Sequence, residues 1–199
     1  VAGVFAILAG LLYTVIQFIH PPENLHSVNS SAWQIVACLS IAMSLFFLIG
    51  IIGIYMKQVE KVGLLGLIGF ILFSLFWLIS MTFSFIEAFV YPLIIDDAPK
   101  FVEGMLGLFG ESKSAVNLGV FTVLAPIAGI LYMLGSLLLG IATFRAKVFP
   151  RAAGILFSFA GVVTLATAII PHPYDRILAL PMGVVFIWLG YILCFDKEG

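Results

Sequence analysis

Glu87 is the residue best placed to do chemistry in this sequence, because it is an ionisable side chain within a long apolar stretch. A charge near the centre of a bilayer costs about 2.5–3.5 kcal/mol on insertion scales, so such residues face protein or a wet cavity. At helical steps of three or four residues, Glu87 shares one face with a polar and aromatic stripe: Trp77, Ser80, Ser84 and Tyr91. The stripe predicts that Glu87 faces the interior of a bundle.

A second stripe of the same kind lies near the start of the chain and consists of Tyr13, Gln17 and His20. If both stripes face inward, they form a polar pocket that opens at one side of the membrane. We therefore predict a ligand-binding set made up of Glu87, Gln17, Tyr13, Ser84 and Tyr91, with His20 at the mouth. The alternative is that a protonated Glu87 joins helices through a hydrogen bond to Gln17, a serine or a backbone carbonyl, with no ligand.

Three histidines and two acidic residues form a second candidate site: His20, His26, His172, Glu23 and Asp175. Imidazole and carboxylate ligands suit Zn²⁺, Cu²⁺ or Fe²⁺, so this group is a hypothetical metal site. His20 and His172 also lie at comparable depth, as the axial ligands of a b-type haem would. Against both hypotheses, histidine is also common at a membrane interface as a hydrogen-bonded helix end. The favoured reading of the sequence needs no cofactor.

These side chains must be positioned by membrane-spanning helices. The chain is 63% hydrophobic and 10% charged, against about 25% charge in a soluble domain. A helix needs about 20 apolar residues to cross a bilayer, and the apolar runs are too long for barrel strands. We predict an all-α, polytopic membrane protein whose residues 1–199 form one bundle of six transmembrane helices. The predicted spans are 2–20, 32–56, 63–94, 116–143, 152–170 and 177–195.

Basic residues predict the orientation of this bundle, because cytoplasmic loops are richer in Lys and Arg. One side holds Lys57, Lys61, Arg145, Lys147, Arg151 and Lys197, whereas the other holds Lys100, Lys113 and Arg176. We therefore expect a multi-pass protein of the cell membrane with both termini in the cytoplasm. The loops 21–31, 95–115 and 171–176 then face outward. Since the chain begins at Val1 rather than Met, we also expect residues to precede it.

Small residues at helical spacing predict where helices pack. One such face consists of Gly3, Ala6 and Gly10, and another of Gly154, Ser158 and Gly161. The two sets open helical hairpins of similar sequence, which suggests three parallel hairpins about an axis along the membrane normal. The alternative is that these are ordinary close-packing positions. The two cysteines, Cys38 and Cys194, lie near opposite faces, so we expect no disulfide between them.

The loop from residue 95 to 115 is apolar for a connection, and it resembles a short amphipathic segment interrupted by Gly104, Gly107 and Gly110. We expect it to rest on the membrane interface and shield helix ends. The alternative is a lid over the polar pocket.

The sequence lacks the motifs of several functional classes. It has no phosphate-binding loop, HExxH, CxxC or Gly-x-Ser-x-Gly, and it has no basic arm that would bind nucleic acid. The first hypothesis is binding or transport of a small molecule, proton or lipid through the pocket. The second is a structural or accessory subunit that packs against another membrane subunit. The third is an enzyme or haem protein with a metal at the outer face. The sequence thus favours a membrane protein without enzymatic activity, with the lipid bilayer and a small hydrophobic ligand as its partners.

Overall fold

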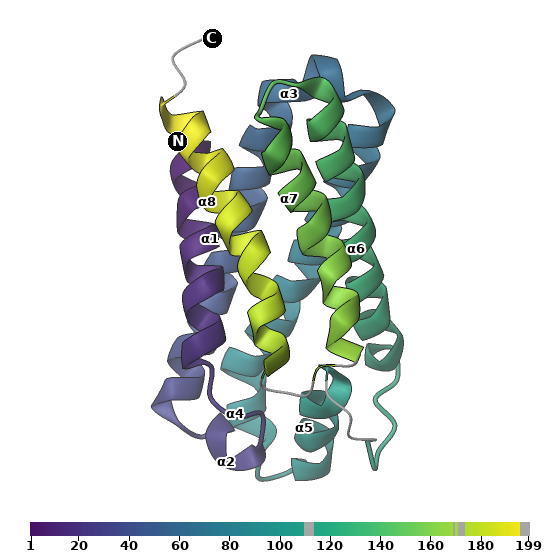
Figure 1. Ribbon diagram of the computed structural model, residues 1–199. Coiled ribbons are helices and arrows are strands. Elements are labelled where there is room, and N and C mark those ends of the chain that lie inside the picture. The colour runs from purple at the N-terminus through teal and green to yellow at the C-terminus, as the bar shows by residue number, and fades with distance from the viewer. Residues whose placement is uncertain (110–113, 169, 171–173, 196–199) are drawn as a thin grey trace.

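The computed structural model describes residues 1–109, 114–168, 170 and 174–195, and every regular element in these ranges is helical. Long helices run side by side, and short helices gather at one end (Figure 1). The long helices are α1 (Ala2–Ile19), α3 (Ser31–Phe85), α6 (Phe121–Ala146), α7 (Arg151–Val162) and α8 (Leu180–Phe195). The short elements are α2 (Leu25–Val28), the π-helix η1 (Ile86–Val90), α4 (Tyr91–Ile94), α5 (Pro99–Leu106) and the 3₁₀ helices η2 (Gly107–Phe109), η3 (Val163–Ala168) and η4 (Tyr174–Ala179).

The long helices agree with a helical membrane bundle. Within the described ranges, four segments are long and apolar enough to cross a membrane: Ala2–Ile19, Ser31–Ile94, Phe121–Ala146 and Arg176–Phe195. The predicted spans 32–56 and 63–94 run together into one 64-residue segment, and the predicted span 152–170 is represented by the shorter apolar helix Arg151–Ala166. The latter leaves α-helical geometry at Val163, where η3 begins. Judged by helix length and apolar composition, the six predicted spans therefore correspond to four long segments and one shorter helix.

Helix α3 reverses direction at Gly63, which has φ 57° and ψ −159°. Glycine adopts positive φ without the penalty that a Cβ would impose, so one residue is enough for the reversal. Rings from the two arms meet across it: Tyr55 stacks on Phe70 with centroids 4.5 Å apart, and Phe47 stacks on Trp77 at 3.7 Å. The predicted spans 32–56 and 63–94 leave residues 57–62 between them, and these residues are helical up to the glycine.

Small residues let the helices approach closely, as their spacing predicted. A Cβ on Gly3 would lie 2.7 Å from the Gly190 carbonyl oxygen, so α1 and α8 are in backbone contact. On the other side of the bundle, a Cβ on Gly154 would lie 2.6 Å from the Phe144 nitrogen, which joins α7 to α6. Such close backbone approach is how membrane helices gain packing energy, because lipid provides no hydrophobic drive between them.

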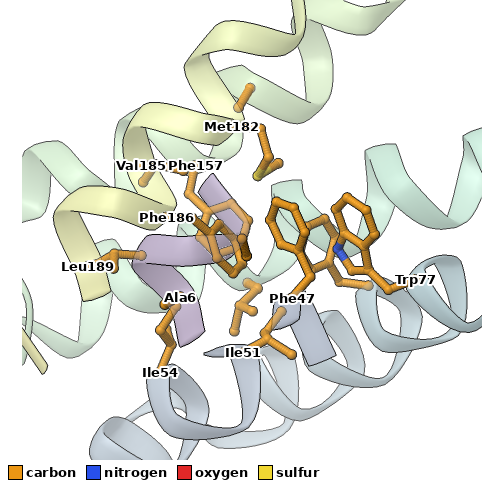
Figure 2. Packing of buried hydrophobic residues seen from close by; sticks show 14 of the residues in the cluster. Ala6, Phe47, Ile51, Ile54, Trp77, Phe157, Met182, Val185, Phe186 and Leu189 are labelled. Carbon is orange, nitrogen blue, oxygen red and sulfur yellow. The ribbon is translucent and has the colours of Figure 1, made fainter. Parts of the chain in front are cut away.

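Aromatic side chains fill the centre of the bundle. We define the central aromatic cluster by its members from both arms of α3 and from α1, α6, α7 and α8: Tyr13, Phe47, Phe73, Trp77, Tyr132, Phe157 and Phe186. Phe73 contacts the rings of Tyr132, Phe157 and Phe186 at centroid distances of 5.7, 5.4 and 6.0 Å. Figure 2 shows the Phe47 and Trp77 rings face to face beside Phe157 and Phe186. Aromatic side chains thus occupy most of the interior at mid-height.

One polar pair is buried at the end of the bundle near Gly63. The Gln58 side-chain amide donates to the Thr143 hydroxyl at 2.9 Å, which links the first arm of α3 to α6. Both residues are fully or almost fully buried, at 1% and 0% exposure. The Gln58 Oε1 atom has no hydrogen-bond partner among the described residues.

The opposite end is covered by a cap, which we define as α2, α4 and α5. Figure 1 shows these three helices together at one end of the bundle. The first residues of α1 and the last residues of α8 lie at the other end. The buried face of α5 carries Val102 and Met105, which pack in one cluster with Trp33 and Tyr91. Within the segment predicted to rest on the interface, Pro99–Leu106 therefore forms a helix that covers the bundle end. Cys38 and Cys194 are both free, as predicted.

Candidate functional site

Glu87 lies in the π-helix η1, which follows α3 directly. A π-turn widens the helix by one residue and leaves carbonyl groups without their usual partners, and such turns are frequent at functional sites. Here the Trp33 indole N–H donates to the Glu87 carbonyl oxygen at 3.1 Å. The bond ties the first arm of α3 to the widened turn in the second arm. It fixes the backbone from which the Glu87 carboxyl projects.

Two carboxylates lie near each other at this point. Glu23, from the segment between α1 and α2, interacts electrostatically with Glu87, and Tyr91 interacts with both. Tyr91 is 1% exposed, whereas Glu87 is partly exposed. In the described part of the chain, neither the Glu87 carboxyl nor the Tyr91 hydroxyl makes a hydrogen bond. The site therefore brings two carboxyl groups together, and no described side chain forms a hydrogen bond or ion pair with the one on Glu87.

Arg176 from η4 provides the positive charge at the mouth of this site. Its Nη2 atom lies 3.3 Å from Glu23 Oε1 and forms an ion pair there. The Arg176 side chain is 16% exposed and that of Glu23 is 35% exposed, so solvent screens the pair. Since the guanidinium is committed to Glu23, the described geometry leaves Glu87 without an ion pair.

His20 stands beside Arg176 and presents one nitrogen in a defined protonation state. Its Nδ1 atom lies 2.8 Å from the Pro21 carbonyl oxygen, which can only accept. Nδ1 therefore carries hydrogen, and the 3.3 Å approach of Arg176 Nη2 brings two donors together rather than forming a hydrogen bond. In the neutral ring, Nε2 then holds the lone pair. The ring also packs edge-on against Trp33 with centroids 5.6 Å apart.

The two predicted stripes meet, although not through the contact that the sequence suggested. The Tyr13 ring packs edge-on against Trp77 at 5.7 Å, which joins the stripe of α1 to that of α3. Trp77 and Ser84 are buried, so the α3 stripe faces inward as predicted. Gln17, however, donates its amide to the Tyr13 carbonyl on its own helix at 3.1 Å. The alternative in which Gln17 hydrogen-bonds Glu87 is thus not the arrangement found.

The hypothetical metal site stays a prediction. His26 is exposed on α2, and His20 and Glu23 both approach Arg176, a cation that competes with a metal ion. Among the residues that the structure describes, no group of three or more His, Cys, Asp or Glu side chains could hold a metal ion. His172 lies outside the described residues, and so does the Asp175 side chain. The haem hypothesis depends on His172 and is untested for the same reason.

Sequence reasoning missed two residues of the site, Trp33 and Arg176. A tryptophan near the start of a span is typical of an interface anchor, so nothing in its position signalled the bond to Glu87. Arg176 was predicted only as a basic residue that sets the orientation of the bundle. Its distance of 153 residues from Glu23 along the chain hid the ion pair, although both were predicted to lie in outer loops.

No family model, curated protein or solved structure matches this chain.

Proposed function

We propose that this protein binds a small molecule carrying a positive charge or hydrogen-bond donors, in a pocket at the cap end of a membrane-embedded helical bundle. The observation that supports the proposal most directly is the Glu87 carboxyl, which projects from a π-turn beside Tyr91 and Glu23 with no hydrogen bond or ion pair in the described chain. A carboxylate kept in this setting favours a ligand that supplies the missing charge or donors.

The chemistry of the surrounding groups limits what the ligand can be. Glu87 and Glu23 are acceptors when ionised, and the two carboxyl groups lie close enough to interact. Arg176, the cation at the mouth, is already paired with Glu23. An anionic ligand would be repelled by an ionised carboxyl group, whereas a protonated amine would be attracted to it.

We further propose that the chain crosses the bilayer six times. In this arrangement each arm of α3 is one crossing, and α7 with η3 is another. The cap end then faces outward, and both termini and the Gly63 turn face the cytoplasm. The hairpins pair α1 with the first arm of α3, the second arm with α6, and α7 with α8. The close approach of Gly50 to Ala6 and of Gly69 to Leu139 supports the first two pairs, and the basic residues near Gly63 support the orientation.

Binding is better supported than transport. The central aromatic cluster packs rings from six helical segments between the Glu87 site and the Gly63 end. Trp77 is 1% exposed, and Phe47 and Phe186 are fully buried. A ligand at the cap end would have to displace these rings to pass through. Transport would therefore require a second conformation of the bundle, whereas binding requires none.

The direct test is ligand-dependent thermal stabilisation of the purified protein in detergent or nanodiscs. A panel of small hydrophobic amines is compared with carboxylic acids of matched shape, and we expect only amines to raise Tm. Glu87→Gln keeps the size of the side chain and should abolish the shift while Tm without ligand stays within a few degrees. Glu60→Gln, which removes an exposed carboxyl from the other end of the bundle, should keep the full shift.

Two results would contradict the proposal. A shift that survives in Glu87→Gln would place binding elsewhere. A collapse of the unliganded fold in Glu87→Gln, together with no response of the unsubstituted protein to any amine, would favour the accessory-subunit hypothesis, in which Glu87 serves only to hold helices together.

A further inference from the structure

The central aromatic cluster holds polar atoms that nothing in the described chain satisfies. The Trp77 indole Nε1 and the Tyr132 hydroxyl are both buried and have no hydrogen-bond partner. Trp77 is 1% exposed and Tyr132 is 5% exposed. In native proteins the large majority of buried polar atoms are paired, because an unpaired one loses its hydration without compensation. Two such atoms in one cluster call for an explanation.

Tyr13 brings a third polar group to the same place. Its hydroxyl lies close to the Tyr132 hydroxyl without making a hydrogen bond of normal geometry, and its ring packs edge-on against Trp77. The Tyr132 and Trp77 rings both contact Phe76, at 4.8 and 4.9 Å. Three helical segments, namely α1, the second arm of α3 and α6, therefore each direct a polar side chain into the central aromatic cluster.

We propose that one small hydrogen-bond acceptor binds between Tyr13, Trp77 and Tyr132 in the centre of the bundle. The indole N–H can only donate, so the bound group must carry a lone pair. The two hydroxyls can each donate or accept, and a group that bonds all three satisfies every polar atom at this point. A water molecule has this chemistry, since buried waters typically make about three hydrogen bonds. So has the carbonyl or hydroxyl oxygen of a lipid-soluble compound.

This site is distinct from the Glu87 site and does not rest on it. Trp77 precedes Glu87 by ten residues, which corresponds to about 15 Å along a helix. The Glu87 site calls for donors or positive charge, whereas the central site calls for an acceptor. Failure of either proposal leaves the other unaffected.

Indole NMR tests the central site without any substitution. The chain has three tryptophans, and Trp33, whose indole N–H is bonded to the Glu87 carbonyl, serves as an internal reference. With ¹⁵N-labelled tryptophan, we expect the Trp77 indole proton to resonate downfield, near that of Trp33. A cross-peak to water identifies water as the acceptor. A cross-peak to ligand protons, together with a compound recovered by solvent extraction and mass spectrometry, identifies a lipid-soluble one.

A substitution cycle tests whether the two hydroxyls share one partner. If they do, Tyr132→Phe and Tyr13→Phe should each lower Tm, and the double variant should lose much less than the sum of the two. Tyr191→Phe, which removes an exposed hydroxyl, is the control and should leave Tm unchanged. The proposal is overturned if the Trp77 indole resonates as a group without a hydrogen bond. It is equally overturned if Tyr132→Phe raises Tm, as removal of a truly unpaired hydroxyl would.

Discussion

Trp33 shows how a single side chain can position an acid at a distance. Its indole N–H reaches the Glu87 carbonyl across 54 residues of sequence. Trp33→Phe keeps the aromatic bulk and removes the donor, so we expect a loss of about 1 kcal/mol in unfolding free energy. We also expect weaker amine-dependent stabilisation, because the π-turn is no longer held. Trp188→Phe is the matched control, and denaturant unfolding with and without ligand measures both effects. Equal effects of the two substitutions would contradict this role.

Arg176 should matter for ligand affinity more than for stability. Its ion pair with Glu23 is partly exposed, and such pairs contribute about 0–1 kcal/mol. Arg176→Gln removes a positive charge beside the proposed amine site, so amines should bind several-fold more tightly with little change in Tm. Titration of the thermal shift against amine concentration gives the affinity. Weaker amine binding in Arg176→Gln would show that the site prefers an anion instead.

Gln58 and Thr143 form a buried pair whose partners depend on each other. Thr143→Val leaves the Gln58 amide without its 2.9 Å partner, which should cost about 1–3 kcal/mol. Gln58→Leu combined with Thr143→Val removes both polar groups and should recover most of that loss. A double variant less stable than Thr143→Val would show that Gln58 has another partner. Chemical unfolding of the unsubstituted protein, Thr143→Val and the double variant measures these differences in unfolding free energy.

At the scale of elements, glycines determine how closely α6 approaches the second arm of α3. A Cβ on Gly135 would lie 2.5 Å from the Phe73 nitrogen, so Gly135→Ala must push the two helices apart. Overpacking of this kind costs about 1–3 kcal/mol. Gly129→Ala is a matched control on the same helix, because a Cβ there meets nothing within 4 Å. Because alanine has a higher helix propensity than glycine, Gly129→Ala should leave the unfolding free energy unchanged or raise it. A Gly135→Ala variant as stable as Gly129→Ala would contradict the packing.

Helix positions and packing faces could be predicted from the sequence, because apolar length and small-residue spacing act locally. The inward-facing stripe of Trp77, Ser84 and Glu87 followed from the same periodicity. The sequence did not reveal the reversal at Gly63, since residues 57–62 are charged enough to resemble a loop although they are helical. It also did not reveal the π-turn or the partners of its carbonyl. These depend on contacts between residues far apart in the chain.

At the scale of the whole molecule, the polar groups are arranged by depth. The acidic site lies under the cap, the central aromatic cluster fills the middle, and the Gln58 pair lies near Gly63. Because the aromatic cluster fills the middle, the proposed binding site at Glu87 requires access from the cap end. The proposed function depends on this access, because a buried Glu87 that no solute reaches could not bind a ligand.

The most direct measurement is the reactivity of a cysteine at position 87. Glu87→Cys is made in a background with Cys38→Ser and Cys194→Ser, and cells or oriented vesicles are treated with membrane-impermeant thiol reagents. We expect reaction from outside only, several-fold faster with a cationic reagent than with an anionic one, because Glu23 lies nearby. Gln58→Cys, near the other end, should stay unreactive from outside. No reaction at position 87, or reaction only from the cytoplasmic side, would contradict an outward-facing binding site at Glu87.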